Sequence, residues 1–370
     1  MLKKIEWGLR YALLQSLRVL ARSRHAPPAS LPVARSRILF IRQDRIGDVL
    51  VSTPLFAALK ERYPDYTIDI VLSRNNHFVL ENSPHVRRRW VYTKGLLSSL
   101  RLLRRIRAEH YDFVVDLMDN PSATSTVILL LAGGRWNVGL EKENAYAYDI
   151  IVPMKSRKES HIVERIAELL RPFGIDPATV NLRVRYTIGE KAEREVSEFL
   201  ESGRYAEGPK VGINISAGSD TRFWGVPNYR ELLRRLTSAF PGLSFILLGK
   251  GEDRQRLLEI AEGVPQTIAA PETSFDGFAA WISRLSILIT PDTSAVHLAA
   301  AFDIPSVVLY VQSNPDLRIW EPYRSLSEAL VTTVDDLKTI SVSDVVEAFE
   351  RLSTRMREGH LSGLLTGEQR

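Results

Sequence analysis

The most constraining feature of this sequence is a series of short apolar segments, rich in β-branched residues, that alternate with segments of helical periodicity. The helical segments cover residues 53–62, 98–109, 190–200, 229–239 and 295–301. The apolar segments cover residues 38–41, 68–72, 113–117, 211–215, 245–248, 287–289 and 306–311. They show no alternation of polar and apolar side chains, so we expect each strand to be buried on both faces. The pattern predicts an α/β protein with parallel sheets covered by helices.

The strand and helix pattern occurs twice, on either side of a stretch near residues 153–189 that holds a helical segment and several turn residues. A chain of 370 residues also exceeds the roughly 250–300 residues that one core usually supports. We therefore predict two Rossmann-like domains, at residues 37–185 and 186–340. A basic helix with a proline-rich linker (1–36) would precede them, and a C-terminal helix and tail (341–370) would follow.

Composition and charge limit the classes of function. With 45% apolar and 25% charged residues the chain has the balance of a soluble globular protein. Cysteine is absent, which excludes disulfides and thiolate chemistry and fits a reducing compartment. The net charge of +5 conceals two basic segments, +7 over residues 1–37 and +8 over 87–107. These segments indicate anionic partners at defined places. Their aromatic residues are not interleaved at the spacing on which successive bases stack, so no nucleic acid is expected as a partner.

Residues 1–24 have the pattern of a basic amphipathic helix, which Pro27 and Pro28 would end. Leu9, Leu13 and Leu17 fall on one face, and most of the lysines and arginines fall on the other. Such a helix either lies in the headgroup region of an anionic bilayer or docks on its own protein. A signal peptide is disfavoured because arginines interrupt the apolar stretch.

The first candidate site follows the first predicted strand, where the sequence reads IRQDRIGDVL. Ligands of open α/β sheets bind beyond the carboxyl ends of the strands, which places Asp44, Arg45, Gly47 and Asp48 at such a position. Asp48 suits either the cap of the following helix or a general base. The spacing matches neither a dinucleotide-binding glycine pattern nor a Walker A loop.

Two further candidates follow strands of the second half. Ser216, Ala217 and Gly218 form a turn of small residues, and Arg222 follows at a suitable distance to bind a phosphate. The alternative is an ordinary loop with a surface arginine. Glu252 follows the Gly-Lys-Gly turn at 249–251, where a carboxylate can bind a ribose or can simply belong to a turn.

The sharpest candidate is a buried strand that runs into PDTSAVH and then a helix. The amide groups of a helix N-terminus, with the hydroxyls of Thr293 and Ser294, form an anion site beside Asp292. The alternative has Asp292 or Thr293 as the cap and His297 as a core histidine. The sequence has no Asp-x-Asp, no His-x-x-x-His and no Gly-x-Ser-x-Gly, so neither a protein-held metal nor a nucleophile elbow is indicated.

Taken together, four segments resemble glycosyltransferase family 9, the ADP-heptose:lipopolysaccharide heptosyltransferases and their relatives. ILFIRQDRIGDVLVSTP resembles the family's strand followed by R-x-x-x-x-GD-x-x-x-x-x-P, and NISAGSDTRFWGVPNY resembles its second-domain phosphate-binding segment. PDTSAVHLAAAFDIPSVVLY resembles the [ND]-D-[ST]-[GS]-x-x-H-x-A-A element, and IWEPYR the closing W-x-P segment. The four stand in the family's order over residues 37–325.

The resemblance implies a GT-B fold, in which two Rossmann-like domains face each other across a cleft. It implies an inverting, metal-independent transfer of a sugar from a nucleotide sugar, by family default ADP-heptose, with no further cofactor. The acceptor would be an anionic lipid-linked saccharide at the inner face of a bacterial inner membrane, to which residues 1–24 would bind.

By the same resemblance, Asp48 would be the general base. The acceptor would be bound near Arg45 and Gly47, and the basic residues Arg87, Arg88 and Arg89 would attract its anionic groups. The donor would be bound by Ser216, Ala217, Gly218, Arg222, Glu252, Asp292, Thr293, Ser294, Ala295 and His297.

Three departures from the family pattern put the donor sugar in doubt. Ser294 replaces a glycine, Arg222 stands where a lysine is frequent, and Pro227 comes later than usual. Serine tolerates positive φ poorly, so the loop before the helix is expected to differ. Two alternatives stay open: a nucleotide-sugar epimerase on the same fold, and a non-catalytic glycan-binding or assembly protein that has kept the fold.

Overall fold

The computed structural model describes residues 12, 14–21, 35–203, 208–311 and 320–366, with side chains up to residue 358. The chain divides into two compact units, with the boundary between Thr187 and Ile188. The greater part of the helix predicted at residues 1–24 lies outside the described residues.

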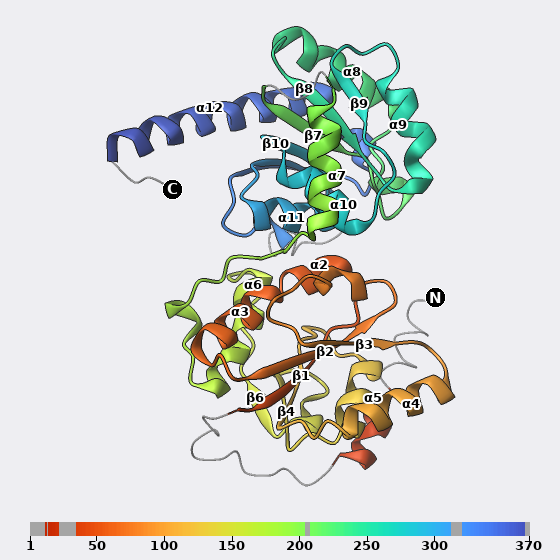
Figure 1. The fold of residues 1–370 in the computed structure, drawn as a ribbon, viewed down its shortest axis with the longest axis vertical. Helices are drawn as coiled ribbons and strands as arrows, with labels where there is room; N and C mark the ends of the chain where they lie inside the picture. Colours follow the sequence, from red (N-terminus) through yellow and green to blue (C-terminus); the bar gives the residue numbers. More distant parts are fainter. Residues whose placement is uncertain (1–11, 13, 22–34, 204–207, 312–319, 367–370) are drawn as a thin grey trace. The chain divides into compact units, whose positions relative to one another are not determined.

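The first unit is built on a six-stranded parallel sheet with the order β3-β2-β1-β4-β5-β6 (Figure 1). The strands are β1 (Arg37–Ile41), β2 (Thr67–Ser73), β3 (Arg88–Tyr92), β4 (Phe113–Asp116), β5 (Trp136–Leu140) and β6 (Ile150–Val152). The helices are α2 (Ile46–Leu50), α3 (Thr53–Arg62), α4 (Leu96–Arg107), α5 (Ala123–Leu131) and α6 (Ile162–Ala167).

Helices cover both faces of this sheet, as the apolar strands predict. Leu39 and Ile41 of β1 pack with α4 and α5 on one face. Phe40 points to the other face, where its ring lies 5.0 Å from that of Phe56 in α3. Both faces of β1 are therefore buried, which is why its sequence is an unbroken apolar run.

The second unit holds another six-stranded parallel sheet, with the order β12-β11-β10-β7-β8-β9. The strands are β7 (Lys210–Asn214), β8 (Ser244–Leu248), β9 (Thr267–Ala269), β10 (Ile287–Pro291), β11 (Ser306–Tyr310) and β12 (Ser327–Val331). When the strands are counted within each unit, the two sheets have the same order. The expected α/β fold of two Rossmann-like sheets is confirmed.

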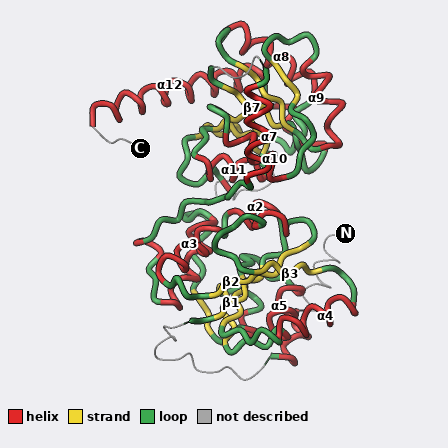
Figure 2. The backbone as a smooth tube through the Cα atoms, in the orientation of Figure 1, coloured by secondary structure: helices red, strands yellow, loops and turns green. Residues whose placement is uncertain are grey.

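The helices of the second unit are shown in Figure 2. They are α7 (Glu190–Glu201), α8 (Val226–Ala239), α9 (Arg254–Ala261), α10 (Phe275–Ser283), α11 (Ser294–Phe302) and α12 (Val342–Thr366). Residues 341–370 were expected as a separate C-terminal element. The first turns of α12 instead belong to the core of the second unit, where Val345, Phe349 and Leu352 are buried against α8 and the sheet.

Seven of the twelve described strands were predicted, and each lies within two residues of its expected bounds. The five that were missed are β3, β5, β6, β9 and β12, which lie in the outer parts of the two sheets. Their sequences include charged or polar residues, such as Arg88 in β3 and Glu328 in β12. β3, β6, β9 and β12 are edge strands, which need no continuous apolar run. β5 is an inner and mostly buried strand, but Asn137 and Gly139 interrupt its apolar sequence.

The described part of the N-terminal segment packs on the first unit. Leu14 and Leu17 are buried, and the 3₁₀ turn η1 (Leu17–Leu20) contacts α5. The Tyr146 hydroxyl donates to the carbonyl of Leu14, and the Arg18 guanidinium lies 5.4 Å from the centre of the Tyr146 ring. Among the described residues, no helix is long and apolar enough to span a bilayer.

Two candidate sites at the sheet switch points

In each sheet the order of the strands reverses at one place, between β1 and β4 in the first unit and between β7 and β10 in the second. The loops that follow two such neighbouring strands run in opposite directions, which leaves a crevice where ligands of open α/β sheets bind. The predicted motifs follow β1, β7, β8 and β10, so the sequence-derived sites lie at or beside these positions.

Arg42 is the centre of the first candidate site. It directly follows β1, and its side chain is fully buried. Its Nε donates to the Asp48 carbonyl at 3.0 Å, and its Nη2 donates to Asp48 Oδ1 at 3.2 Å. Its Nη1 donates to the carbonyl of Leu117, which follows β4. One buried guanidinium therefore ties the two loops of the switch point together.

Asp48 lies in the first turn of α2 and is 7% exposed. Its Oδ2 accepts a hydrogen bond from the backbone N–H of Arg45 at 3.0 Å. This contact satisfies one of the amides that a helix start leaves free, so Asp48 does cap α2. A carboxylate has about four acceptor positions, and Arg42 and Arg45 use two of them. The cap and a catalytic role are therefore compatible.

Asp44 is a second carboxylate beside the same guanidinium. Its Oδ1 lies 3.3 Å from Arg42 Nε but accepts no hydrogen bond from the described residues. The pKa of Asp44 is raised to about 7, chiefly by burial. The negative charges of Asp48 and Asp119 also raise this pKa, whereas the positive charge of Arg42 acts to lower it. Burial alone would lower the pKa of Arg42, but the surrounding aspartates, Asp44 and Asp48 first among them, together raise it.

The loop after β4 supplies a group that the sequence analysis missed. Asp119 is 7% exposed, and its Oδ2 lies 3.3 Å from Arg165 Nη1 and 3.1 Å from Arg157 Nη2. Arg157 also donates to Asn120. The available signal was an Asp-Asn pair shortly after a buried strand, at a strand end where ligands of open α/β sheets bind.

The structure places Arg87 and Arg88 away from Asp48. They stand at the amino end of β3, whereas Asp48 follows the carboxyl end of β1, and the strands are parallel. Arg87 donates to Asp69 Oδ1 at 2.9 Å, and this contact raises the pKa of Arg87. Both arginines also bind Glu109, whose pKa they lower. Their charge is balanced within the protein, and their role in acceptor binding stays a prediction.

Arg89 is engaged as well. Its Nη1 donates to the His77 carbonyl at 3.1 Å, and its Nη2 lies 3.6 Å from Glu81 Oε1. An acceptor role for this side chain also stays a prediction.

Asn214 organises the second candidate site, although the sequence analysis did not single it out. It ends β7 and is fully buried. Its Oδ1 accepts from the N–H of Ser216 at 3.1 Å. Its Nδ2 donates to Thr290 at 2.9 Å and to Thr293 at 3.2 Å. One amide therefore fixes the turn after β7 against the loop after β10. A polar residue at the end of an apolar strand was the available signal.

The next residues of this turn become progressively more exposed. Ser216 is buried and Ala217 is half-buried, while Gly218 is exposed and a Cβ at its position would meet no atom within 4 Å. Arg222 ends a short 3₁₀ turn, and its Nη1 lies 3.5 Å from Asp292 Oδ2. The structure thus brings Arg222 together with Asp292 across the switch point, as expected for one binding site.

The N-terminus of α11 lies beside Asp292. Thr293 is the cap, and its hydroxyl accepts from the N–H of Ala295 at 3.3 Å. Ser294 is the first helical residue and does not have a positive φ, so a serine fits here without strain. His297 is buried, with its ring centre 6.1 Å from that of Trp320.

Glu252 lies in the 3₁₀ turn after β8, the strand next to β7. Its side chain is 75% exposed, and its Oε1 lies 3.5 Å from Lys250 Nζ. Neighbouring strands bring Glu252 to the same edge of the sheet as Asn214. The structure therefore leaves this carboxylate free to meet a ligand at that edge.

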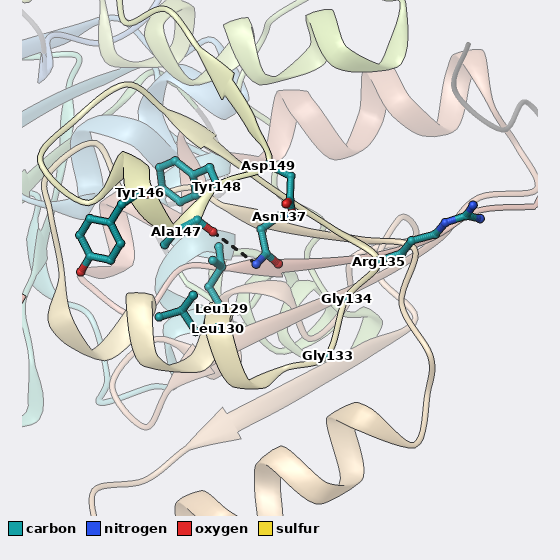
Figure 3. Close-up of a pocket in the computed structure, with 10 residues that line it drawn as sticks. All are labelled: Leu129, Leu130, Gly133, Gly134, Arg135, Asn137, Tyr146, Ala147, Tyr148 and Asp149. Carbon is teal, nitrogen blue, oxygen red and sulfur yellow. Dashed lines mark hydrogen bonds between the residues drawn. The ribbon is translucent and has the colours of Figure 1, made fainter. Parts of the chain in front are cut away.

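A small pocket lies elsewhere, between the end of α5 and the start of β5 (Figure 3). Figure 3 shows Asn137, whose Nδ2 donates to the Ala147 carbonyl at 3.3 Å, and Arg135, which points away. The start of β5 lies at the amino edge of its sheet, so this pocket is not part of the switch-point site. In the described parts of the chain, no three His, Asp or Glu side chains are arranged to hold a metal.

Two doubly wound parallel sheets, each with charged and polar side chains at its switch point, define an α/β protein with two Rossmann-like units. The sequence profile of glycosyltransferase family 9 (heptosyltransferase) matches residues 99–348. The chain belongs to glycosyltransferase family 9 and is a glycosyltransferase.

Several curated relatives are lipopolysaccharide heptosyltransferases. The chain is 24% identical to lipopolysaccharide heptosyltransferase 3 of Escherichia coli, over 75% of this chain and 83% of that protein. It is 27% identical to lipopolysaccharide heptosyltransferase 2 of Salmonella typhimurium, over 76% and 84%.

Solved structures share the fold. A glycosyl transferase family 9 protein from Veillonella parvula superposes with a TM-score of 0.74 at 20% identity, over 87% of this chain and 98% of that one. The Escherichia coli heptosyltransferase WaaC with ADP superposes with a TM-score of 0.68 at 19% identity, over 86% and 98%.

Proposed function

We propose that this protein transfers a heptose from ADP-heptose, with inversion and without a metal, to a saccharide of a lipopolysaccharide core. The observation that carries the proposal is the presence of one candidate site in each unit of a chain that belongs to glycosyltransferase family 9. A carboxylate held by a buried guanidinium stands at one switch point. An arginine, a carboxylate and a helix N-terminus stand at the other.

Asp48 serves as the general base in this proposal. It accepts the proton of the acceptor hydroxyl as that oxygen attacks the anomeric carbon of the sugar. The bond from that carbon to the diphosphate breaks on the opposite face, so the configuration inverts and ADP leaves. Asp48 keeps acceptor positions for this proton because Arg42 and Arg45 occupy only two of them in the described structure. Arg45 and Gly47 of the same turn would contact the acceptor.

The second site binds the nucleotide and the leaving group. The backbone of Ser216, Ala217 and Gly218 approaches the diphosphate, and Arg222 balances the charge that develops there. The N-terminal amides of α11, including that of Ala295, supply further donors. Glu252 binds the ribose, and Asp292 contacts the sugar, with Ser294 and His297 nearby.

Calorimetry with ADP, UDP and GDP in the presence of EDTA tests the donor part of this proposal. Selective binding of ADP, lost in Arg222→Ala or Glu252→Ala, is the expected result. Preference for UDP or GDP would refute an ADP-linked donor, and binding that requires a divalent ion would refute metal independence.

Product analysis tests the reaction itself. The expected product from ADP-heptose and a lipopolysaccharide-core acceptor is a new glycosidic bond of inverted configuration together with free ADP. An epimerised nucleotide sugar formed without an acceptor would replace the proposal with an epimerase. Binding of ADP with no product from a panel of core acceptors would support a non-catalytic protein.

We further propose that the protein works at the inner surface of the bacterial inner membrane, where a lipid-linked acceptor would be available. The basic segments at residues 1–37 and 87–107 support this placement. Deletion of residues 1–30 is expected to weaken binding to anionic liposomes.

A further inference from the structure

The start of α4 exposes three large apolar side chains. Leu96 is 77% exposed, Leu97 is 69% exposed and Leu100 is 48% exposed. Further along the same helix, Leu102 and Ile106 are buried in the core of the first unit. The first turns of α4 therefore extend beyond the core and leave three leucines in contact with solvent.

Cations surround these leucines. Lys94, Arg101 and Arg104 are exposed, and among the described residues none of them lies within ion-pair distance of a carboxylate. No acidic residue occurs between Glu81 and Glu109. The charges of Arg87 and Arg88, by contrast, are balanced by Asp69 and Glu109.

We propose that this surface, formed by Lys94, Leu96, Leu97, Leu100, Arg101 and Arg104, inserts into the headgroup region of an anionic lipid bilayer. Leucines beside unpaired cations are the combination that an interfacial helix needs, because the apolar side chains enter the acyl boundary while the cations meet lipid phosphates. We call it the α4 lipid surface.

Charge argues against the other occupants. A second copy of the chain docked on the same surface would bring like charges together at close range. Residues 1–11 of this chain are themselves basic, with Lys3, Lys4 and Arg10 against Glu6. An anionic lipid surface is the partner that balances the charge and covers the leucines at the same time.

The position of the α4 lipid surface suits an enzyme whose acceptor is linked to a lipid. This part of the inference rests on the proposed function. α4 begins after the carboxyl end of β3, and Asp48 follows the carboxyl end of β1 in the same parallel sheet. The α4 lipid surface therefore begins where the chain leaves the carboxyl end of β3, in the same parallel sheet whose strand β1 leads to the candidate base.

Sedimentation of the full-length protein with vesicles tests the inference. The wild type should bind vesicles that contain phosphatidylglycerol and should not bind phosphatidylcholine vesicles. Leu96→Gln with Leu97→Gln should weaken binding at least about tenfold, because burying a leucine contributes more than one factor of ten. Arg101→Gln with Arg104→Gln should also weaken it and reduce its dependence on salt.

Matched controls come from the second unit. Leu258 is 46% exposed on α9, and Lys191 and Arg194 are exposed on α7. Leu258→Gln, and Lys191→Gln with Arg194→Gln, should bind vesicles like the wild type. Binding of ADP is measured separately on the same variants, so a failure of the proposed donor site and a failure of the lipid surface are distinguishable.

A fluorescent probe tests insertion directly. The chain has no cysteine, so Leu97→Cys offers a unique position for an environment-sensitive dye. Its emission should rise severalfold and shift to the blue on anionic vesicles, whereas a dye on Leu258→Cys should not respond. Wild-type binding by the double leucine variant would overturn the inference. A dye at position 97 whose emission does not change on anionic vesicles would also overturn it. So would a double leucine variant that loses self-association but keeps its binding to vesicles.

Discussion

The Nη2 atom of Arg42 lies 3.2 Å from Oδ1 of Asp48, and the side chain of Arg42 is fully buried. The same guanidinium holds the carbonyl groups of Asp48 and Leu117. Three acceptors from two loops thus depend on one buried cation. The position of the candidate base is set by Arg42 as much as by the helix that carries it.

Removing Arg42 should therefore destabilise the first unit. Arg42→Ala leaves Asp44 and Asp48 buried without their cation, and loss of one partner of a buried pair costs about 3–5 kcal/mol. Arg42→Lys keeps the charge and should lose less, because a single ammonium cannot hold all three acceptors in the same geometry. Urea unfolding of both variants measures the free energy. A loss below about 1 kcal/mol for Arg42→Ala would contradict this role.

Asp48→Asn separates capping from catalysis. The asparagine carbonyl can still accept from the Arg45 N–H, so α2 keeps its cap, but the side chain can no longer take a proton. We expect turnover to fall by about 10²–10⁴ while affinity for ADP is unchanged. Steady-state kinetics and calorimetry provide the two numbers. Wild-type turnover in Asp48→Asn would show that Asp48 only caps the helix.

Asp44 should make stability depend on pH. Burial raises its pKa to about 7, above the value of about 3.9 in an unfolded chain. Between these values the folded protein holds a proton that the unfolded chain has released. Asp44 therefore favours folding most below about pH 4, and this contribution is lost as the pH rises to about 7.

The difference between wild type and Asp44→Asn isolates this contribution. Relative to the variant, the wild type should lose up to about 4 kcal/mol in the free energy of unfolding between pH 4 and pH 8. Urea unfolding at several pH values measures it, with Asp220→Asn, an exposed site, as the control. A difference that is constant over this range would contradict the assigned environment of Asp44.

Asn214→Ala should disturb the donor site although it replaces none of the residues proposed to bind the ligand. It removes the acceptor of the Ser216 amide and the donor to Thr290 and Thr293, which leaves buried polar groups unsatisfied. We expect a loss of about 1–3 kcal/mol in stability. Affinity for ADP should fall with it. Asn228→Ala removes one amide contact, to the Trp224 carbonyl, outside this site and should leave ADP affinity unchanged.

Arg222→Ala should reduce turnover more than it reduces folding stability. The side chain is partly exposed and pairs with Asp292 at 3.5 Å, so its removal costs little stability. Loss of one donor to a developing negative charge reduces rates by about 10²–10³. Arg222→Lys, which keeps the charge, should recover part of the rate. Equal kinetics of Arg222→Ala and wild type would remove this residue from the mechanism.

Local sequence patterns were enough to predict the centre of each sheet and the helices beside it. The seven predicted strands all have a neighbouring strand on each side, where burial on both faces demands apolar β-branched runs. The motif at Asp48 and the helix start at Thr293 were also visible, because each combines a strand end with residues that begin a helix.

Other features depend on residues that are far apart in the sequence, and only the tertiary structure decided them. Asp69 and Glu109 balance Arg87 because β2, β3 and the end of α4 lie side by side, a result of strand order. Asn214 contacts Thr290 because β7 and β10 are neighbours although 76 residues separate the two side chains.

The sequence by itself therefore determined the α/β class, the family resemblance and the strand ends at which the candidate sites lie. The tertiary structure decided which charges are balanced within the protein and which face solvent. It also decided that Arg42 joins two loops and that the leucines at the start of α4 are exposed. The physical reason is that periodicity reports local burial, whereas ion pairing and exposure depend on which distant segments the sheet order brings together.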